Sequence, residues 1–294
     1  MSYTSIAIIY NPNSTGPSKS LAVELKSKLR KQLPDCKVEL IATKHAGHAE
    51  ELAYSIATSS KRPLIISSSG DGGYNEVING AMKAKREGAS PTVGLLPAGN
   101  ANDHYRNLHD KELIDRIVQD DPIEIDILKI VGVSDGKRIE RYAHSYIGFG
   151  LTPVVGNELN KTKLNFFSEV WIVIRLLFTI KSVRLKVGNK ARYYESLICS
   201  NVDEMSKYMK ISQPSSVTDG KFEVTIFKRR SKLRLILTLL KASFIGVKES
   251  AQISEYSLKT LGKTLAQADG EIIHLDANSD VQIKIDQQIL PSLV

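Results

Sequence analysis

The first hundred residues alternate short apolar runs with amphipathic segments, and this alternation constrains the fold more than any other feature. The apolar runs, which we expect to be strands, are Ser5–Tyr10, Val38–Ala42, Pro63–Ser68 and Thr92–Leu96. The segments between them, which we expect to be helices, are Lys19–Leu33, His48–Ser59 and Tyr74–Arg86. Strands that alternate with helices form parallel sheets covered by those helices. Residues 1–124 are therefore predicted to be an α/β domain.

After Pro122 the pattern changes to one strand after another. The expected strands are Ile123–Val131, Arg138–Ile147, Val183–Val187, Tyr193–Ser200, Phe222–Lys228, Ser254–Leu261, Glu271–Leu275 and Val281–Asp286. Helices are expected at about residues 165–181 and 232–247. Strands in succession favour antiparallel pairing, so residues 125–280 are predicted to be an all-β, sandwich-like second domain.

The net charge of +8 is concentrated in one part of the chain. Residues 126–241 hold 21 Lys and Arg against 10 Asp and Glu, whereas residues 1–125 hold 15 of each. This excess predicts an anionic partner. The sequence shows no zinc finger or RNP pattern, so we expect no nucleic acid. The basic run Lys228–Arg234 before Leu235–Leu240 is compatible with a solvated helix start or with binding at an anionic membrane surface.

Several features bear on the cellular location. Two cysteines cannot form a disulfide framework, and the N-terminus has no basic leader. Charged residues interrupt the longest apolar stretches, at 166–180 and 233–247, so neither reaches the length of a spanning helix. We expect a cytoplasmic protein whose membrane contact is peripheral, at the inner face of the membrane.

The strongest local motif is Leu64–Val77, in which an apolar strand runs into a turn with three glycines and then a helix. This geometry directs backbone N–H groups and a helix N-terminus at one point, which suits a phosphate chain. The loop is neither a Walker A loop nor a G-x-G-x-x-G fingerprint. Asp71 inside it would repel phosphate unless a cation lies between them, which points to a Mg²⁺-nucleotide. The alternative is a turn that only connects strand and helix.

Two further polar loops follow strands at the same expected sheet edge, where open α/β sheets bind ligands. They are Asn11–Gly16 and Gly94–His104.

Together these motifs resemble a known family. Asn-Pro-x-Ser, Gly-Asp-Gly with x-x-Asn-Glu-Val-x-Asn-Gly, and Pro-x-Gly-x-x-Asn-Asp look like the catalytic domain of diacylglycerol kinases and sphingosine kinases, most closely the soluble bacterial lipid kinases. In the second half, Ser145–Gly150, Thr218–Phe222 and Ala268–Glu271 are similar to further family turns.

The resemblance implies a NAD kinase/diacylglycerol kinase-like fold that uses ATP and Mg²⁺, with a lipid-binding second domain and a segment 281–294 that returns to the first domain. The family's nucleotide contacts correspond to Asn11, Pro12, Asn13, Ser14, Thr15, Thr43, Ser69, Gly70, Asp71, Gly72, Gly73, Asn75 and Asn100.

The resemblance also implies catalytic and metal-binding roles. Asp269 or Glu271 would take the proton from the lipid hydroxyl, and Asp71 would lie near Mg²⁺ and the phosphates. Asp219 would hold a structural Mg²⁺ with the backbone carbonyls of Ser216 and Lys221. Taken alone, Asp269-Gly270-Glu271 is also compatible with an ordinary hairpin turn.

The sequence departs from the family at four places. Gly73 and Asn100 replace threonines, Thr152 replaces an acidic residue, and Met205–Lys210 replaces a glycine run. The function expected is an ATP-dependent lipid kinase, with diacylglycerol as the default substrate. A kinase for a soluble acceptor and a catalytically silent lipid-binding regulator remain alternatives, and a homodimer is left open.

Overall fold

The computed structural model describes residues 3–14, 16–108, 111–159, 172, 175–176, 178, 181–205, 209–211, 215–229, 231–232, 234–238 and 250–293. The chain divides into two compact units. The first contains Met1–Ile125 and Gln288–Val294, and the second contains Asp126–Gln287.

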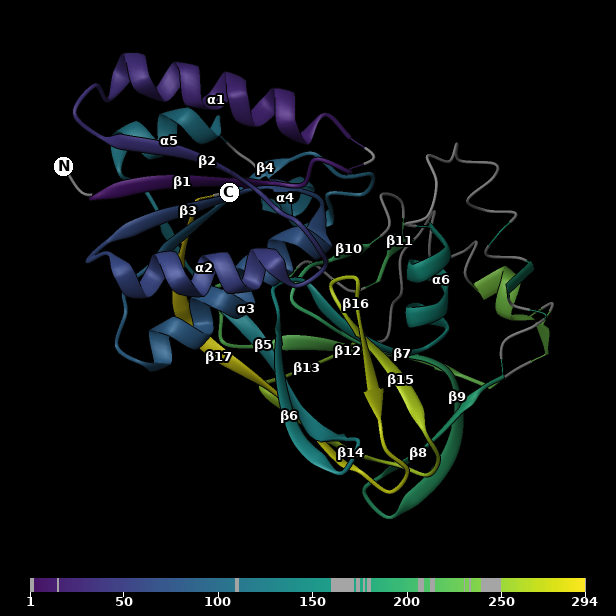
Figure 1. Cartoon of the computed structure of the whole chain (residues 1–294). Coiled ribbons are helices and arrows are strands. Elements are labelled where there is room, and N and C mark those ends of the chain that lie inside the picture. Colours follow the sequence, from purple (N-terminus) through teal and green to yellow (C-terminus); the bar gives the residue numbers. More distant parts are fainter. Residues whose placement is uncertain are drawn as a thin grey trace. The chain divides into compact units, whose positions relative to one another are not determined.

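The first unit is an α/β fold. Its elements are β1 (Ser5–Tyr10), α1 (Ser18–Gln32), β2 (Lys37–Ala42), α2 (His48–Ser59), β3 (Pro63–Ser69), α3 (Asp71–Arg86), β4 (Thr92–Pro97), α4 (Asp103–Leu108) and α5 (Leu113–Gln119). The strands pair in parallel in the order β2-β1-β3-β4. Helices α1 and α5 cover one face of this sheet, and α2 and α3 cover the other (Figure 1).

The burial of β3 explains why its first four residues, 63–66, are apolar without alternation. All seven of its residues are buried, as expected for a central strand of a parallel sheet covered on both faces. The helix after it begins at Asp71, not at Tyr74 as expected, because the Tyr74 N–H already bonds to the Gly70 carbonyl (3.1 Å). Gly72 and Gly73 therefore lie in the first helical turn.

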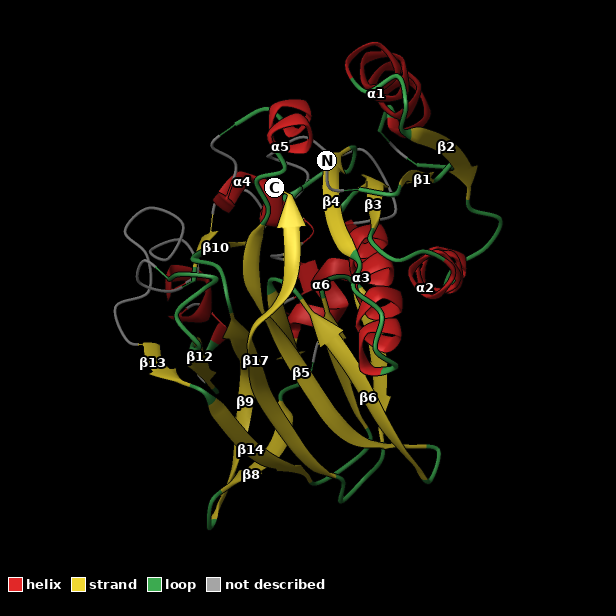
Figure 2. Cartoon of the chain, turned by 90° about the vertical axis from the view of Figure 1, so that its left-hand side faces the viewer, coloured by secondary structure: helices red, strands yellow, loops and turns green. Residues whose placement is uncertain are grey.

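The second unit is rich in antiparallel strands. Its elements are β5 (Ile123–Ser134), β6 (Lys137–Ala143), β7 (Tyr146–Gly150), α6 (Leu151–Leu159), β8 (Val183–Val187), β9 (Lys190–Ser200), β10 (Glu204–Met205), β11 (Met209–Lys210), β12 (Phe222–Lys228), β13 (Ser250–Ile253), β14 (Glu255–Thr260), β15 (Thr264–Ala268), β16 (Glu271–Leu275) and β17 (Asp280–Leu293). Strands β16, β15, β7, β9, β8, β14 and β17 pair antiparallel in that order. Figure 2 labels β9, β8, β14 and β17 of this series.

The structure of this unit departs from the sequence expectations, which also lacked β10, β11, β13 and β15. The expected strand Arg138–Ile147 is broken into β6 and β7 at His144-Ser145, because the backbone N–H groups there bond to a side chain. Helix α6 follows β7 directly and was not expected. The helices expected at 165–181 and 232–247 lie largely outside the described residues. The described positions 172, 175–176, 178, 232 and 234–238 are helical.

Strand β17 belongs to both units. Its first half pairs with β14, and its last residues pair in parallel with β4, Ser292 opposite Val93. Leu293 is fully buried in the core of the first unit. Within the ranges given above, no helix has the length and apolar character needed to cross a membrane.

Candidate active site

The loops after β1, β3 and β4 meet backbone to backbone. A Cβ at Gly99 would lie 2.3 Å from the Gly70 Cα, and one at Gly16 would lie 2.0 Å from the Ala98 carbonyl oxygen. Side chains cannot fit at these two contacts, which is why glycine occupies both positions. The contacts hold the three polar loops at the carboxyl edge of the parallel sheet.

The N-terminus of α3 lies among these loops. Gly70 is its N-cap, and no side chain of the described residues caps it. The helix is 16 residues long, and its first turn contains Gly72 and Gly73, which have no side chains to shield the backbone. Such a terminus presents N–H groups and a partial positive charge, so it fits a phosphate group.

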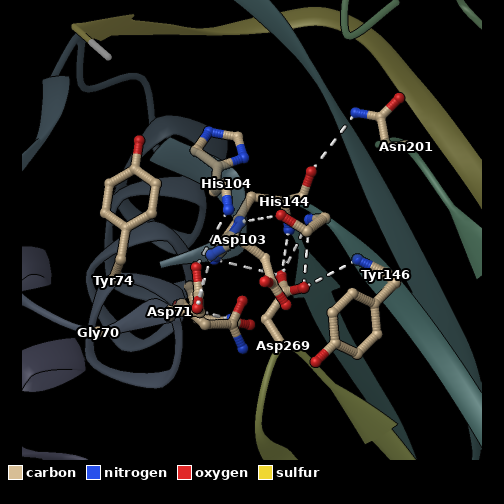
Figure 3. Close-up of polar contacts among 12 residues, drawn as sticks. Gly70, Asp71, Tyr74, Asp103, His104, His144, Tyr146, Asn201 and Asp269 are labelled. Carbon is tan, nitrogen blue, oxygen red and sulfur yellow. Dashed lines mark hydrogen bonds and ion pairs between the residues drawn. The ribbon is translucent and has the colours of Figure 1, made fainter. Parts of the chain in front are cut away.

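Asp71 connects two of the loops. Its carboxylate accepts hydrogen bonds from the backbone N–H groups of Asp103 (3.1 Å) and His104 (3.2 Å), at the start of α4 (Figure 3). The sequence motif suggested a role near Mg²⁺ and phosphate, which stays a prediction. What the structure adds is that Asp71 fixes the β4–α4 loop against the β3–α3 loop.

The Ser69 side chain limits the space at position 73. A Cβ at Gly73 would lie 2.6 Å from Ser69 Oγ and 2.7 Å from Ser69 Cβ. The Ser69 hydroxyl is fixed by contacts with Ser67 Oγ (2.7 Å) and the Gly70 carbonyl (2.9 Å). The Ser69 side chain thus occupies the space that a side chain at position 73 would need.

The remaining predicted nucleotide contacts are distributed as follows. Asn11, Pro12, Asn13 and Ser14 form the β1–α1 loop, where the Asn13 N–H bonds to Asn11 Oδ1 (2.9 Å). Thr43 lies at the same edge, because its N–H bonds to the Tyr10 carbonyl (2.9 Å).

Of the other two predicted contacts, Asn75 belongs to α3 and Asn100 to the loop before α4. Asn100 is half-buried in the β4–α4 loop, and Asn75 is fully buried within α3. Thr15 lies outside the described residues. Thus most of the predicted set shares one sheet edge, whereas Asn75 is enclosed.

In the second unit, Asp269 occupies the turn between β15 and β16. Asp269 (φ 44°) and Gly270 (φ 99°) both have positive φ, which is typical of a type I′ hairpin turn. The Asp269 carboxylate accepts hydrogen bonds from the backbone N–H groups of His144, Ser145 (3.2 Å) and Tyr146 (2.8 Å) (Figure 3). Asp269 therefore belongs to an ordinary hairpin turn, and its carboxylate is also bound by three backbone N–H groups of residues 144–146.

The environment of Asp269 changes its acidity. The residue is buried, with 1% of its surface exposed, and the His144 Nε2 atom lies 3.4 Å from its carboxylate. Burial raises its pKa from 3.8 to about 7, against the opposing effect of the backbone N–H donors. A carboxyl group with this pKa can accept or release a proton near neutral pH.

Glu271, the second carboxylate of the motif, is held differently. Its Oε1 atom accepts hydrogen bonds from Arg141 Nε (2.8 Å) and Nη2 (2.5 Å). Arg141 is on β6, so the ion pair joins the β15–β16 hairpin to the neighbouring strand. The two carboxylates of the motif therefore have distinct partners.

The predicted metal-binding turn is held by a buried aspartate that the sequence did not single out. The Gly220 N–H bonds to Asp126 Oδ2 (2.6 Å), and the Asp126 N–H bonds to the Val217 carbonyl (2.6 Å). Asp219 itself is exposed, and its Oδ1 atom accepts from the Lys221 N–H (3.0 Å). Ser216 is also exposed, and its hydroxyl contacts Thr218 Oγ1 (3.0 Å).

An exposed carboxylate such as that of Asp219 is an oxygen donor that suits Mg²⁺, and the part of the Ser216 and Lys221 carbonyls stays a prediction. Near it, burial raises the pKa of Glu223 to about 7, and the charge of Asp219 adds to this effect.

Asn201 links this turn to the segment that binds Asp269. Its Nδ2 atom bonds to the Asp126 carbonyl (3.0 Å), and its N–H bonds to the Ser145 carbonyl (2.7 Å). Hydrogen bonds thus run from the Asp219 turn to the N–H groups around Asp269. None of His144, Asp126 and Asn201 was singled out from the sequence, because their role depends on hydrogen bonds to distant residues.

Residues 5–130 match the family model described as the diacylglycerol kinase catalytic domain. They belong to that family. The diacylglycerol kinase of Staphylococcus carnosus (strain TM300) is 24% identical over 253 residues, which cover 79% of this chain and 76% of that protein. Sphingoid long-chain bases kinase 1 of Arabidopsis thaliana is 37% identical over 99 residues, covering 32% of this chain and 13% of that protein.

Solved structures of similar fold extend over the whole chain. A diacylglycerol kinase from Bacillus anthracis str. Sterne has a TM-score of 0.68 at 16% identity and covers 100% of this chain and 97% of its own. Yeast NADH kinase complexed with NADH has a TM-score of 0.55 at 9% identity, with 99% and 82% covered. The predicted fold class and the diacylglycerol kinase resemblance are confirmed, and the family supports a lipid kinase, a phosphotransferase.

Proposed function

We propose that this protein transfers the γ-phosphate of ATP to the hydroxyl group of a lipid alcohol, with diacylglycerol as the first substrate to test. The observation that carries the proposal is Asp269, a buried carboxyl held by three backbone N–H groups with a pKa of about 7. It occurs in a chain that contains a diacylglycerol kinase catalytic domain. Phosphoryl transfer to an alcohol needs a carboxylate of this kind to accept the hydroxyl proton.

The loops of the first unit support the ATP part of the proposal. The N-terminus of α3 and the glycine contacts around Gly70 and Gly99 would bind the phosphates. When bound, Mg²⁺ would neutralise phosphate charge. Asp71, the first residue of α3, is the carboxylate that would lie near the ion. Asp269 would accept the hydroxyl proton. The ion pair with Arg141 would hold the second carboxylate, Glu271, in one orientation.

The β8–β9 hairpin supports a peripheral contact with an anionic membrane at the cytoplasmic side. Residues 181–194 contain five Lys and Arg and no Asp or Glu. Tyr193 is 47% exposed, and the guanidinium groups of Arg184 and Arg229 lie 5.8 and 5.3 Å from its ring centre. Cations around an exposed tyrosine suit the headgroup region of an anionic bilayer.

The test is transfer of radiolabelled phosphate from ATP to a panel of lipids and soluble acceptors in the presence of Mg²⁺. Asp269→Asn should lower transfer at least about 100-fold, because a general base contributes that much or more. Asp135→Asn is the matched control, because Asp135-Gly136 forms another turn with two positive φ angles. It should leave the rate unchanged.

Other results would select another function. Labelling of a soluble acceptor alone would favour the soluble-acceptor kinase, and lipid binding without any labelled product would favour the silent regulator. Equal activity of Asp269→Asn and wild type would remove Asp269 as the base.

The membrane contact has its own test, which is co-sedimentation with phosphatidylglycerol and phosphatidylcholine vesicles. Wild type should bind the anionic vesicles only, and salt should weaken the binding. Arg184→Gln with Arg229→Gln should reduce it. Equal binding to both vesicles would contradict the proposed contact.

A further inference from the structure

One carboxylate oxygen of Glu223 is buried without a hydrogen-bond partner. Only 3% of the residue is exposed, and no donor among the described residues contacts its Oε2 atom. The Oε1 atom receives a long hydrogen bond from Gln252 Nε2 (3.4 Å). Burying a carboxylate oxygen without a donor or a cation is costly, so the position calls for a further partner.

The groups around Glu223 are mainly oxygens. Ser200 on β9 and Gln252 on β13 lie directly opposite Glu223 on β12, so the three side chains form a row on one face of the sheet. The Ser200 hydroxyl is also fully buried and makes no hydrogen bond within the described part of the chain. Two unsatisfied oxygens therefore lie on neighbouring strands.

Asp219 adds a second carboxylate at the same place. Its Oδ2 atom accepts a hydrogen bond from Gln252 Nε2 (3.1 Å), the nitrogen that also contacts Glu223. Since one nitrogen lies within 3.4 Å of both carboxylates, the carboxylates lie side by side. Asp203 is near enough for its charge to act on Glu223 as well. A neutral amide cannot balance these negative charges, whereas a divalent cation can.

We propose that Glu223 is a second carboxylate ligand of the divalent-cation site at the Asp219 turn, with the Ser200 hydroxyl as a neutral oxygen donor. Neither Glu223 nor Ser200 belongs to the metal-binding set predicted from the turn motif, which is Ser216, Asp219 and Lys221. The inference rests on the cation site implied by the proposed function. An oxygen-only donor set with two carboxylates suits Mg²⁺ or Ca²⁺ and disfavours softer metals.

The experiment measures Mg²⁺ and Ca²⁺ binding to the full chain by calorimetry, after EDTA treatment and without nucleotide. Glu223→Gln should weaken binding about tenfold or more, and Ser200→Ala should weaken it less. Glu255→Gln is the matched control, because Glu255 also accepts a hydrogen bond from a glutamine, Gln282 (2.5 Å), but is exposed. The Mg²⁺ and Ca²⁺ affinities of the Glu255→Gln variant should equal those of wild type.

Thermal unfolding gives a second readout that a merely structural role would not produce. In EDTA, Glu223→Gln should unfold at the same temperature as wild type or higher, because a neutral amide replaces a buried charge. In excess Mg²⁺ the order should reverse, because only wild type gains the full stabilisation by the bound ion. A variant that is less stable by the same amount in both solutions would contradict the proposal.

The outcomes separate this inference from the proposed cation site itself. Loss of binding in Asp219→Asn with normal binding in Glu223→Gln would overturn the role of Glu223 and leave the Asp219 site standing. Absence of binding in wild type would overturn both. If Glu223→Gln does not fold, Glu223→Asp keeps the charge on a shorter side chain and should change the Mg²⁺ to Ca²⁺ preference. An unchanged preference and affinity would contradict a ligand role.

Discussion

The pair Ser69 and Gly73 makes a quantitative prediction about the glycine-rich loop. In Gly73→Ala the new Cβ would lie 2.7 Å from Ser69 Cβ and 2.6 Å from its Oγ. Carbon atoms in contact are normally about 3.5–4.0 Å apart, so the overlap is roughly 0.8 Å or more. Ser69 is 7% exposed and tied to Ser67, so it has little room to move.

The expected free energies follow from two opposing effects. Overpacking of this size costs about 1–3 kcal/mol, whereas replacing a helical glycine by alanine gains about 1 kcal/mol. Gly73→Ala alone should therefore be neutral or destabilising by about 2 kcal/mol. In the Ser69→Gly background the obstructing side chain is gone, and the same change should stabilise by about 1 kcal/mol.

The assay is urea unfolding of wild type, both single variants and the double variant, analysed as a double-mutant cycle. The coupling free energy between positions 69 and 73 should be about 1–3 kcal/mol. Ser69→Ala is the control background, because it keeps the Cβ atom and so should not relieve Gly73→Ala. Additivity within about 0.5 kcal/mol would refute the steric argument.

Four further predictions concern Asp269, Leu293 and Asp71. Burial raises the pKa of Asp269 to about 7, so between pH 4 and pH 7 the folded protein binds a proton that the unfolded chain has released. The free energy of unfolding should therefore fall as the pH rises from 4 to 7. Asp269→Asn should make it depend less on pH, as measured by unfolding at each pH. If Asp269 is the base, kcat/KM should rise about tenfold per pH unit below 7 and level off above it. Leu293→Ala should cost about 2–5 kcal/mol in thermal unfolding, because Leu293 is fully buried, whereas the exposed Val118→Ala (44%) should be near neutral. Asp71→Asn should cost about 1 kcal/mol and speed hydrogen exchange at the start of α4, because it removes the charge that accepts the Asp103 and His104 N–H groups; unchanged exchange there would contradict this role.

The sequence alone could predict the features that depend on neighbouring residues. The apolar run into Gly70-Asp71-Gly72 predicted a strand, a phosphate-binding loop and a helix, and Asp269-Gly270-Glu271 was compatible with a hairpin turn. The structure has such a turn there, with positive φ at Asp269 and Gly270. These features depend on side-chain periodicity and on the conformations that glycine and aspartate allow, so a few residues are enough to specify them. Helix α3 begins at Asp71, three residues before the expected start at Tyr74, because glycines at a helix start are also typical of a turn.

Only the tertiary structure could show which distant groups serve each carboxylate. Asp269 binds the N–H groups of residues 144–146, about 125 positions away, because β15 pairs with β7 so that Ala268 lies opposite Ile147. The same holds for Glu223, whose neighbours Ser200 and Gln252 come from two other strands.

The sequence by itself thus determined the order of the four strands and of α1, α2 and α3 in the α/β part, and which polar loops follow its strands, whereas α4 and α5 were not expected. The tertiary structure decided the acidity of Asp269 and the anchoring of Asp71. It also showed that the Ser69 side chain limits the space at position 73. The physical reason is that burial, register and close packing are set by contacts between residues far apart in the chain, and no local pattern encodes those contacts.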